Sequence, residues 1–250
     1  MGILLTIAYD GTGYCGWQVQ KNGITICEML EGAVSKLLEG QPFALLGASR
    51  TDSGVHALGQ VAHIREMGVK TKIPPHKMPQ ILNSHLPDDI VVKDAALVPD
   101  DFHPIKDAKS KTYVYKIHNS KIPNPLTSRY TTLVGKKLNV DAMKDACKYF
   151  IGEHDFKTFS VPNSNPLIKT TVREVYNLQI TQNNDHIEVW ISGNGFLHNM
   201  VRIIAGTLVA VGHGQIEPNQ IPQIIASKER DAAGKTMPPQ GLTLVEVFYS

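Results

Sequence analysis

The stretch GASRTDSGVHALGQVAHI, residues 47–64, decides the fold of the first part of the chain. Its apolar end predicts a strand over Gln60–Arg65, and the apolar residues around its start predict another over Phe43–Ala48. A turn between two strands needs only the Ser-Gly pair found here. The connection also carries two opposite charges, Arg50 and Asp52. We therefore interpret it as a functional loop held between two strands.

Outward from this loop, the sequence predicts an α/β (α+β) protein built from two similar halves. The first half reads β-α-β-β-α-β, with one helix beginning at the capping box Thr25–Glu28. The second half repeats the theme loosely. Beyond the two strands above, the expected elements are strands over Ile3–Tyr9, Ile90–Leu97, Thr112–His118, Arg173–Thr181, Ile187–Ser192 and Leu242–Tyr249, helices near Lys77–Ser84 and over Val140–Phe150, Leu197–Val211 and Pro218–Ala226, and a loop over 161–167.

The net charge of +2 hides an uneven distribution along the chain. Residues 106–148 hold 10 Lys and Arg against 3 Asp and Glu, whereas residues 1–105 hold 8 against 11 and residues 149–250 hold 7 against 9. A segment this basic suits a polyanionic partner, although charge alone leaves a merely solvated surface equally open. The pattern of predicted helices and strands is interrupted by charges and a proline near Pro99–Asp107. This interruption predicts two domains, 1–105 and 106–250.

Several classes of protein are disfavoured by composition. The three cysteines form no Cys-x-x-Cys pair and the histidines lack metal-ligand spacing, so we expect neither disulfides nor a metal. The longest apolar run, Met200–Val211, contains Arg202 and is too short to cross a bilayer. No signal peptide is visible, and we expect a cytoplasmic protein.

The glycines of Gly11–Gly16 match the pattern G-x-G-x-x-G after a predicted strand. A dinucleotide site requires the following helix to begin at those glycines, so that its N-terminus meets the pyrophosphate. Here the capped helix begins at Thr25, several residues later. The sequence therefore favours a flexible glycine loop near a substrate over a nucleotide-dependent oxidoreductase.

Arg202 is the only formally charged side chain within the apolar stretch Phe196–Val211. It must either reach the surface along its own stem or meet a carboxylate, because an unpaired buried guanidinium is costly. Asp52 is the other charge in an apolar neighbourhood. We predict that the two side chains pair, which would hold Asp52 ionised and able to act as a nucleophile or base.

Two tyrosines, Tyr113 and Tyr115, lie on one face of a predicted strand inside the basic segment. Such residues are common as half-buried aromatics of a sheet. Aromatic faces beside cations also hold unstacked nucleic-acid bases. The residues alone leave both interpretations open.

Four motifs in fixed order make the chain resemble the tRNA pseudouridine synthase A family, and the resemblance spans nearly the whole sequence. They are YDGTGYCGWQVQ (Tyr9–Gln20), RTDSGVHA (Arg50–Ala57), FHPIKDAKSKTYVY (Phe102–Tyr115) and NGFLHNMVRIIAGTL (Asn194–Leu208). The resemblance implies a pseudouridine synthase fold: two ferredoxin-like halves that share a central antiparallel sheet, with helices on one side and a basic cleft. It also implies an isomerase that acts on tRNA uridines 38, 39 and 40 in the anticodon stem-loop, as a homodimer without a cofactor.

By the same resemblance, Asp52 corresponds to the catalytic aspartate, Tyr113 to the tyrosine that packs on the target base, and Arg202 to the arginine that pairs with the aspartate. Arg50 corresponds to the loop arginine that handles the flipped nucleotide. The further substrate-binding candidates are His56, Lys106, Lys109 and Lys111. One departure is Ile105, which occupies a position where the family usually has arginine; Lys106 beside it can supply the charge.

The chemistry agrees with the residues. Conversion of uridine to pseudouridine breaks the N1–C1′ bond and joins C5 to C1′, so no redox cofactor, metal or nucleotide is consumed. The reaction needs a carboxylate, a surface that retains the detached uracil, and cations that hold the flipped RNA. The remaining alternative is a catalytically silent RNA-binding protein on the same scaffold.

Overall fold

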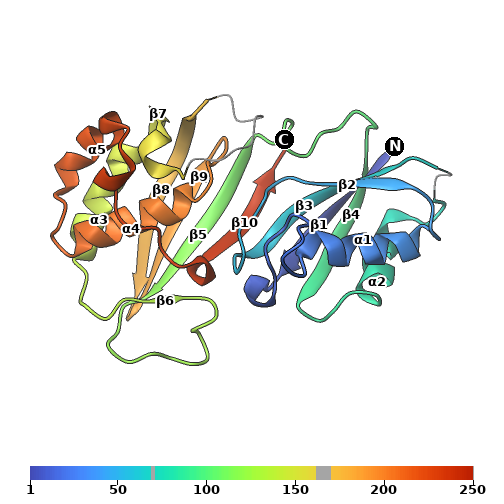
Figure 1. Cartoon of the computed structure of the whole chain (residues 1–250), viewed down its shortest axis with the longest axis horizontal. Coiled ribbons are helices and arrows are strands. Elements are labelled where there is room, and N and C mark those ends of the chain that lie inside the picture. The colour runs from blue at the N-terminus through green and yellow to red at the C-terminus, as the bar shows by residue number, and fades with distance from the viewer. Residues whose placement is uncertain (69–70, 162–169, 250) are drawn as a thin grey trace. The chain divides into compact units, whose positions relative to one another are not determined.

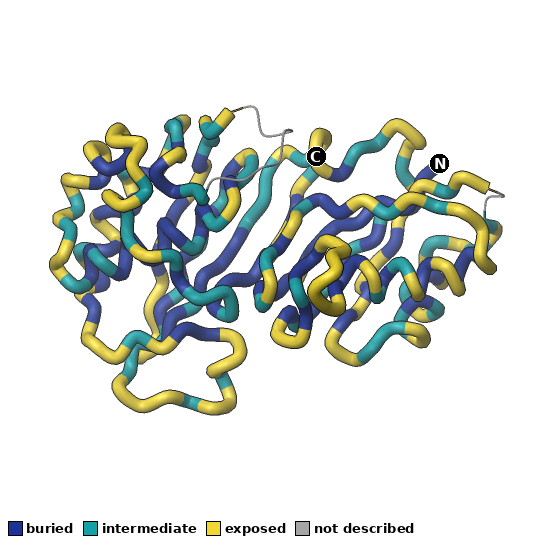
Figure 2. Tube along the Cα trace, viewed as in Figure 1, coloured by how far each residue is buried: buried dark blue, intermediate teal, exposed yellow. Residues whose placement is uncertain are grey.

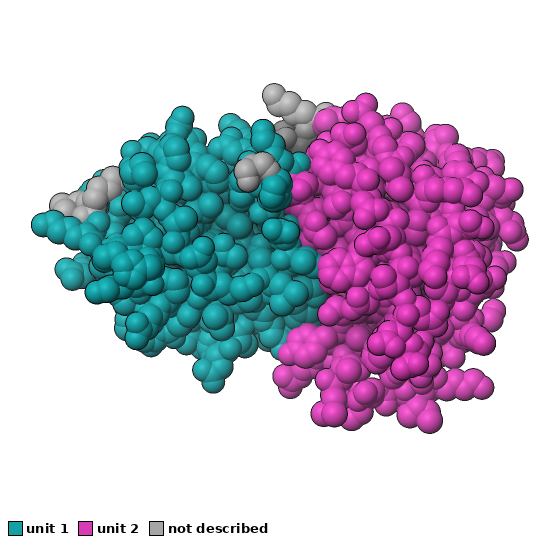
Figure 3. Space-filling view, turned by 180° about the vertical axis from the view of Figure 1, so that it is seen from behind, with its two compact units in different colours: residues 1–109, 243–250 teal, residues 110–242 magenta. Residues whose placement is uncertain are grey.

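The computed structural model describes residues 1–68, 71–161 and 170–249, and the chain forms two compact units (Figures 1 and 3). Unit 1 comprises residues 1–109 together with 243–250, and unit 2 comprises residues 110–242. The sequence places the division after residue 105 and the last strand in the second half. The structure divides after Lys109 and groups that last strand with unit 1. The loop predicted over 161–167 lies, apart from Val161, outside the described residues.

Unit 1 has the predicted β-α-β-β-α-β order. Its sheet runs β4-β1-β3-β10, with β2 beside β3; the pairings are antiparallel except that of β10 with β3. Helices α1 and α2 pack against each other over this sheet (Figure 1). The elements are β1 (Gly2–Tyr9), α1 (Ile26–Leu37), β2 (Phe43–Gly47), β3 (His56–Glu66), α2 (Met78–Asn83), β4 (Ile90–Val98) and β10 (Leu242–Phe248).

The core of unit 1 follows from strand alternation and helix periodicity. Ile3, Leu5 and Ile7 of β1 are buried, and the residues between them are only half-buried. Helix α1 buries one stripe of its surface (Figure 2). Its start is fixed by the Thr25 hydroxyl, which accepts a hydrogen bond from the Glu28 N–H at 3.3 Å, as the capping box predicts.

One edge of β3 pairs with two different segments of the chain. Strand β2 pairs with the second half of β3, where Gly47 is opposite Ala62. Strand β10 pairs with its first two residues, where Thr243 is opposite His56. The loop 48–55 connects β2 to the start of β3, so it leaves the sheet between these two partners of β3.

Unit 2 is a second α/β unit with sheet order β5-β9-β8-β7 and the short strand β6 on β5. Helices α3 and α4 pack on each other, α3 also contacts β8, and α4 contacts β5. Buried and half-buried residues alternate along β9 (Figure 2). The elements are β5 (Ser110–His118), β6 (Thr132–Leu133), α3 (Val140–Cys147), β7 (Gly152–Asp155), β8 (Val172–Asn183), β9 (His186–Gly193), α4 (Met200–Gly212) and α5 (Ile221–Ser227).

The predicted α/β class, the mostly antiparallel pairing and the buried helix near residue 200 are confirmed. In α4 every residue is buried except Arg202 and Ala210. Among the described residues, no helix is both long enough and apolar enough to span a membrane. All three cysteines are free.

Candidate active site

The loop that carries Asp52 is a short excursion between β2 and β3. The Ala48 N–H donates to the Val61 carbonyl at 2.8 Å, which extends the β2–β3 ladder by one residue. The chain then turns, and the Val55 N–H donates to the Asp52 carbonyl at 3.1 Å. Gly54 has a φ of +77°, so the predicted Ser-Gly turn is confirmed. Asp52 is half-buried on this turn and Arg50 is exposed.

The glycine strap, residues 11–17, packs directly on the Asp52 loop. A Cβ atom on Gly11 would lie 2.0 Å from the Val55 carbonyl oxygen, and one on Gly16 would lie 2.6 Å from the Thr51 carbonyl oxygen. Gly16 also has a φ of +84°. The G-x-G-x-x-G match therefore reflects close approach of two backbone segments, and α1 begins only at Ile26.

A buried polar network fixes the start of the loop. The Gln60 side chain accepts from the Ser49 N–H at 3.2 Å and donates to the Ser49 carbonyl at 2.8 Å. Its amide nitrogen lies 3.4 Å from the Tyr9 hydroxyl, which in turn lies 2.8 Å from the Thr51 hydroxyl. The Trp17 N–H donates to the Thr51 carbonyl at 3.0 Å. The residues before Asp52 are thus held through both side chains and backbone.

Tyr14 ties the strap to both the Asp52 loop and Asp89, the residue before β4. Its hydroxyl donates to Asp89 at 2.5 Å, and its carbonyl accepts from the Ser53 hydroxyl at 3.1 Å. Burial, together with the Asp89 carboxylate, raises the pKa of Tyr14 far above its ordinary value. The phenol therefore keeps its proton, and this hydrogen bond persists, across the physiological pH range.

His56 is buried, with 3% of its surface exposed, and supports the strap. Its Nδ1 atom lies 3.1 Å from the Gly11 nitrogen and 3.1 Å from Asp10 Oδ1. Asp10 Oδ1 already accepts from both the N–H and the hydroxyl of Thr12. The His56 ring thus connects the glycine strap to the start of β3.

In unit 2, Tyr113 lies on β5 with 7% of its surface exposed. The ring of Phe196 meets it edge to face, with centroids 5.3 Å apart and planes at 85°. Phe196 is half-buried and follows β9. Such contacts fix the orientation of an aromatic ring.

Arg202 is anchored at the start of α4. Its Nε donates to the Met237 carbonyl at 2.7 Å and its Nη1 donates to Asn199 Oδ1 at 2.6 Å. Asn199 is in the left-handed region with a φ of +63°, and its side chain serves the arginine instead of capping the helix. The guanidinium is half-buried and held in one orientation, as a residue that pairs with a substrate or catalytic group requires.

Lys111 lies near the beginning of β5 and is half-buried. Burial, with a smaller effect of the nearby Arg173 guanidinium, lowers the pKa of Lys111 to about 8. Lys106 and Lys109 are exposed. The backbone N–H groups of Ile105 and Lys106 point to His103 Nδ1, at 3.2 and 3.4 Å, so this segment forms a compact turn.

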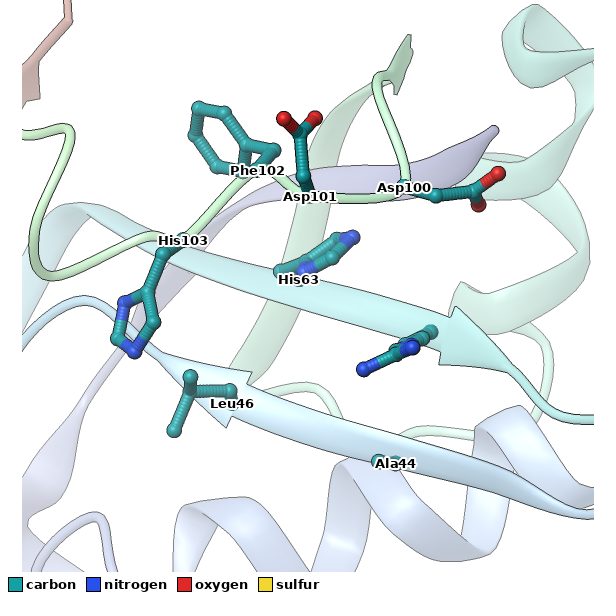
Figure 4. Close-up of a pocket in the computed structure, with 8 residues that line it drawn as sticks. Ala44, Leu46, His63, Asp100, Asp101, Phe102 and His103 are labelled. Atoms are coloured by element: carbon teal, nitrogen blue, oxygen red, sulfur yellow. The ribbon is translucent and has the colours of Figure 1, made fainter.

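A hollow of about 550 Å³ lies in unit 1 beside this turn (Figure 4). The 100–103 segment runs alongside β2 and β3 here, and the rings of His63 and Phe102 meet edge to face at 5.7 Å. Its lining contains neither Asp52 nor Tyr113.

The comparison with known proteins agrees with these motifs. The family profile described as tRNA pseudouridine synthase matches residues 5–105 and 146–250. The chain belongs to the tRNA pseudouridine synthase family. Curated relatives called tRNA pseudouridine synthase A cover 99% of this chain and 99% of their own length; they include those of Caldicellulosiruptor bescii (51% identical over 247 residues), Ruminiclostridium cellulolyticum (48% over 248) and Thermoanaerobacter sp. strain X514 (47% over 247).

As a tRNA pseudouridine synthase, the chain is an isomerase that converts uridine to pseudouridine in tRNA, as the sequence predicts. The predicted site residues are divided between the two units. Unit 1 contains Arg50, Asp52, His56, Lys106 and Lys109, and unit 2 contains Lys111, Tyr113 and Arg202. The pairing of Asp52 with Arg202 stays a prediction. Three supporting residues were not predicted from the sequence: Tyr9, Gln60 and Phe196. Tyr9 and Phe196 lie within the quoted motifs and could have been found there, whereas nothing in the sequence marks Gln60.

Proposed function

We propose that this synthase modifies uridines 38, 39 and 40 in the anticodon stem-loop of tRNA, with Asp52 as the catalytic nucleophile or base. The observation that carries the proposal is the tethering of the Asp52 loop: Thr51 is hydrogen-bonded through its hydroxyl and its carbonyl, and the Asp52 carbonyl closes a turn with Val55. Ser49, Thr51 and the Asp52 backbone are thus each held by at least one hydrogen bond. A carboxylate on such a support can meet the ribose of the target uridine with little reorganisation.

The reaction places three demands on the residues. The N1–C1′ bond must break with assistance from a carboxylate, at C1′ or at the 2′ position, and Asp52 supplies it. The detached uracil must be retained while it turns, and the Tyr113 ring, oriented by Phe196, supplies a surface for it. C5 then bonds to C1′ and loses its hydrogen as a proton. All atoms of the uridine except that exchanged hydrogen stay in the product.

Arg202 is proposed to pair with Asp52 and to keep the aspartate ionised. Its anchoring to Met237 and Asn199 supports this role, because a guanidinium held in one orientation forms directed hydrogen bonds. Lys106, Lys109 and Lys111 are proposed to hold RNA phosphates, and Arg50 the flipped nucleotide. For His56, its burial supports a role through the glycine strap more than direct contact with the substrate.

The remaining parts of the proposal concern the assembly. We propose a homodimer in the cytoplasm that needs no cofactor, as the family resemblance implies. The exposed Ile105, 44% of whose surface is accessible, stands where relatives usually have arginine, and Lys106 is proposed to supply that charge.

The test is release of tritium from tRNA that carries [5-³H]uridine, because formation of the C5–C1′ bond expels the C5 hydrogen. Asp52→Asn should abolish release and retain tRNA binding. Unchanged release in Asp52→Asn would refute the assignment of Asp52, and wild-type protein that binds tRNA without releasing tritium would identify a silent RNA-binding protein. Mapping of pseudouridine in tRNA from cells that lack the protein tests the three positions.

A further inference from the structure

We propose that Gln60 and Tyr9 are positioning residues for this reaction and that they fix the Asp52 loop through the Ser49 backbone and the Thr51 hydroxyl. This inference rests on the proposed role of Asp52. Gln60 and Tyr9 are buried, with exposed fractions of 0% and 5%, and their polar groups bond to Ser49 and Thr51 of the loop. Neither residue takes part in the proposed steps that break and form bonds in the uridine.

Gln60 continues the β-ladder where β2 ends. Its amide accepts from the Ser49 N–H at 3.2 Å and donates to the Ser49 carbonyl at 2.8 Å. A neighbouring strand would offer Ser49 the same pair of bonds. Here the Gln60 side chain makes both bonds in place of a strand. The backbone at Ser49, three positions before Asp52, can therefore turn away from β3 and remain hydrogen-bonded to it.

Tyr9 holds the residue that precedes Asp52. The 2.8 Å contact between the Tyr9 and Thr51 hydroxyls is buried, and the amide nitrogen of Gln60 lies 3.4 Å from the same Tyr9 oxygen. The Thr51 carbonyl is bound separately, by the Trp17 N–H. Removal of the Tyr9 hydroxyl should therefore free the Thr51 side chain without detaching its backbone.

The polar character of this network points to positioning more than to stability. Apolar groups of the same shape can replace a buried hydrogen-bonded pair at little cost in stability, whereas they cannot specify one loop position. A displacement of about 1 Å at a reacting group can lower a rate by about 100-fold. The network is thus placed where small changes in geometry have large kinetic effects.

The experiment compares Tyr9→Phe, Thr51→Val and Thr51→Ser in the full-length enzyme. Single-turnover tritium release from [5-³H]uridine tRNA gives the rate, and filter binding gives the tRNA Kd. We expect Tyr9→Phe and Thr51→Val each to lower the rate by about 10- to 100-fold with an unchanged Kd. Thr51→Ser keeps the hydroxyl and should stay near the wild-type rate. The Tyr9→Phe/Thr51→Val double variant should be no slower than the slower single variant, since both remove the same bond.

The matched control is Thr158→Val, which removes a buried hydroxyl that donates to the Ile224 carbonyl at 3.0 Å in unit 2. It should lower thermal stability without a change in rate. Wild-type rates in both Tyr9→Phe and Thr51→Val, with Asp52→Asn inactive, would overturn the positioning of the loop through the Tyr9–Thr51 contact and leave the proposed function intact. An active Asp52→Asn would instead overturn the proposed function. If Tyr9→Phe does not fold, the contrast between Thr51→Ser and Thr51→Val decides the question alone.

Discussion

The hydroxyl of Tyr9 lies 2.8 Å from the hydroxyl of Thr51, the residue immediately before Asp52. The two residues are 42 positions apart in the chain, and their contact joins the end of β1 to the loop between β2 and β3. The glycine strap that follows Tyr9 packs on the same loop, where the Trp17 N–H donates to the Thr51 carbonyl at 3.0 Å. The position of Asp52 is therefore set by several independent contacts.

The packing of the strap predicts that alanine substitutions at two of its glycines, Gly16 and Gly13, have very different effects on stability and activity. Gly16→Ala places a Cβ 2.6 Å from the Thr51 carbonyl at a φ of +84°, so we expect a loss of about 1–3 kcal/mol in the free energy of unfolding and a large loss of activity. Gly13→Ala meets no atom within 4 Å and should change the free energy of unfolding by no more than about 0.5 kcal/mol. Urea unfolding and tritium release measure both effects. Equal effects from the two variants would contradict the close packing of the strap.

Phe196 is predicted to act through Tyr113. Phe196→Leu removes the edge-to-face contact, worth about 0.5–1.5 kcal/mol, and should lower the single-turnover rate because the Tyr113 ring is no longer fixed. The control is Phe159→Leu, which removes a similar contact with Phe150 at 5.2 Å within the core of unit 2. That variant should destabilise the protein and leave the rate unchanged. A rate loss in Phe159→Leu as large as that in Phe196→Leu would indicate a general effect of instability.

Lys111 predicts a pH dependence of RNA binding. Since burial lowers its pKa to about 8, the side chain is charged at pH 7 and loses its charge as the pH rises through 8. If it holds a phosphate, tRNA affinity should fall between pH 7 and 9. Lys111→Arg keeps its charge over this range and should remove that part of the fall. Lys109→Arg, at an exposed position, should keep the wild-type profile. Titration of labelled tRNA at several pH values measures the difference.

The basic segment, residues 106–148, predicts that tRNA affinity depends on salt concentration. No acidic residue occurs from Ala108 to Val140, and the cations Lys121, Arg129, Lys136 and Lys137 are exposed. If these groups contact phosphates, the logarithm of tRNA affinity should fall steeply against the logarithm of salt concentration. Lys136→Gln with Lys137→Gln should reduce the slope by up to about 2. Lys36→Gln, near the end of α1, should leave it unchanged. An identical slope in all three proteins would exclude phosphate contacts at Lys136 and Lys137.

Most elements of this fold were readable from local patterns, because alternation in β1 and the capping at Thr25 depend only on nearby residues. The short strands β6 and β7 were not predicted. Asp52 and Arg202 could be selected because each is a charge among apolar residues. Gln60 could not, since a glutamine in a strand is ordinary until its partners are known. Those partners, Ser49 and Tyr9, lie 11 and 51 positions away. The place of β10 beside β3 is likewise a long-range pairing that no local pattern specifies.

The pairing of β10 with β3 also orders events during synthesis. Residues 110–242 form a unit of their own, inserted between two parts of unit 1. A ribosome releases the Asp52 loop early, yet the edge of β3 beside His56 receives its partner only when Thr243 and Leu244 emerge. The sheet of unit 1 must therefore wait, incomplete, until the whole of the inserted unit has been made.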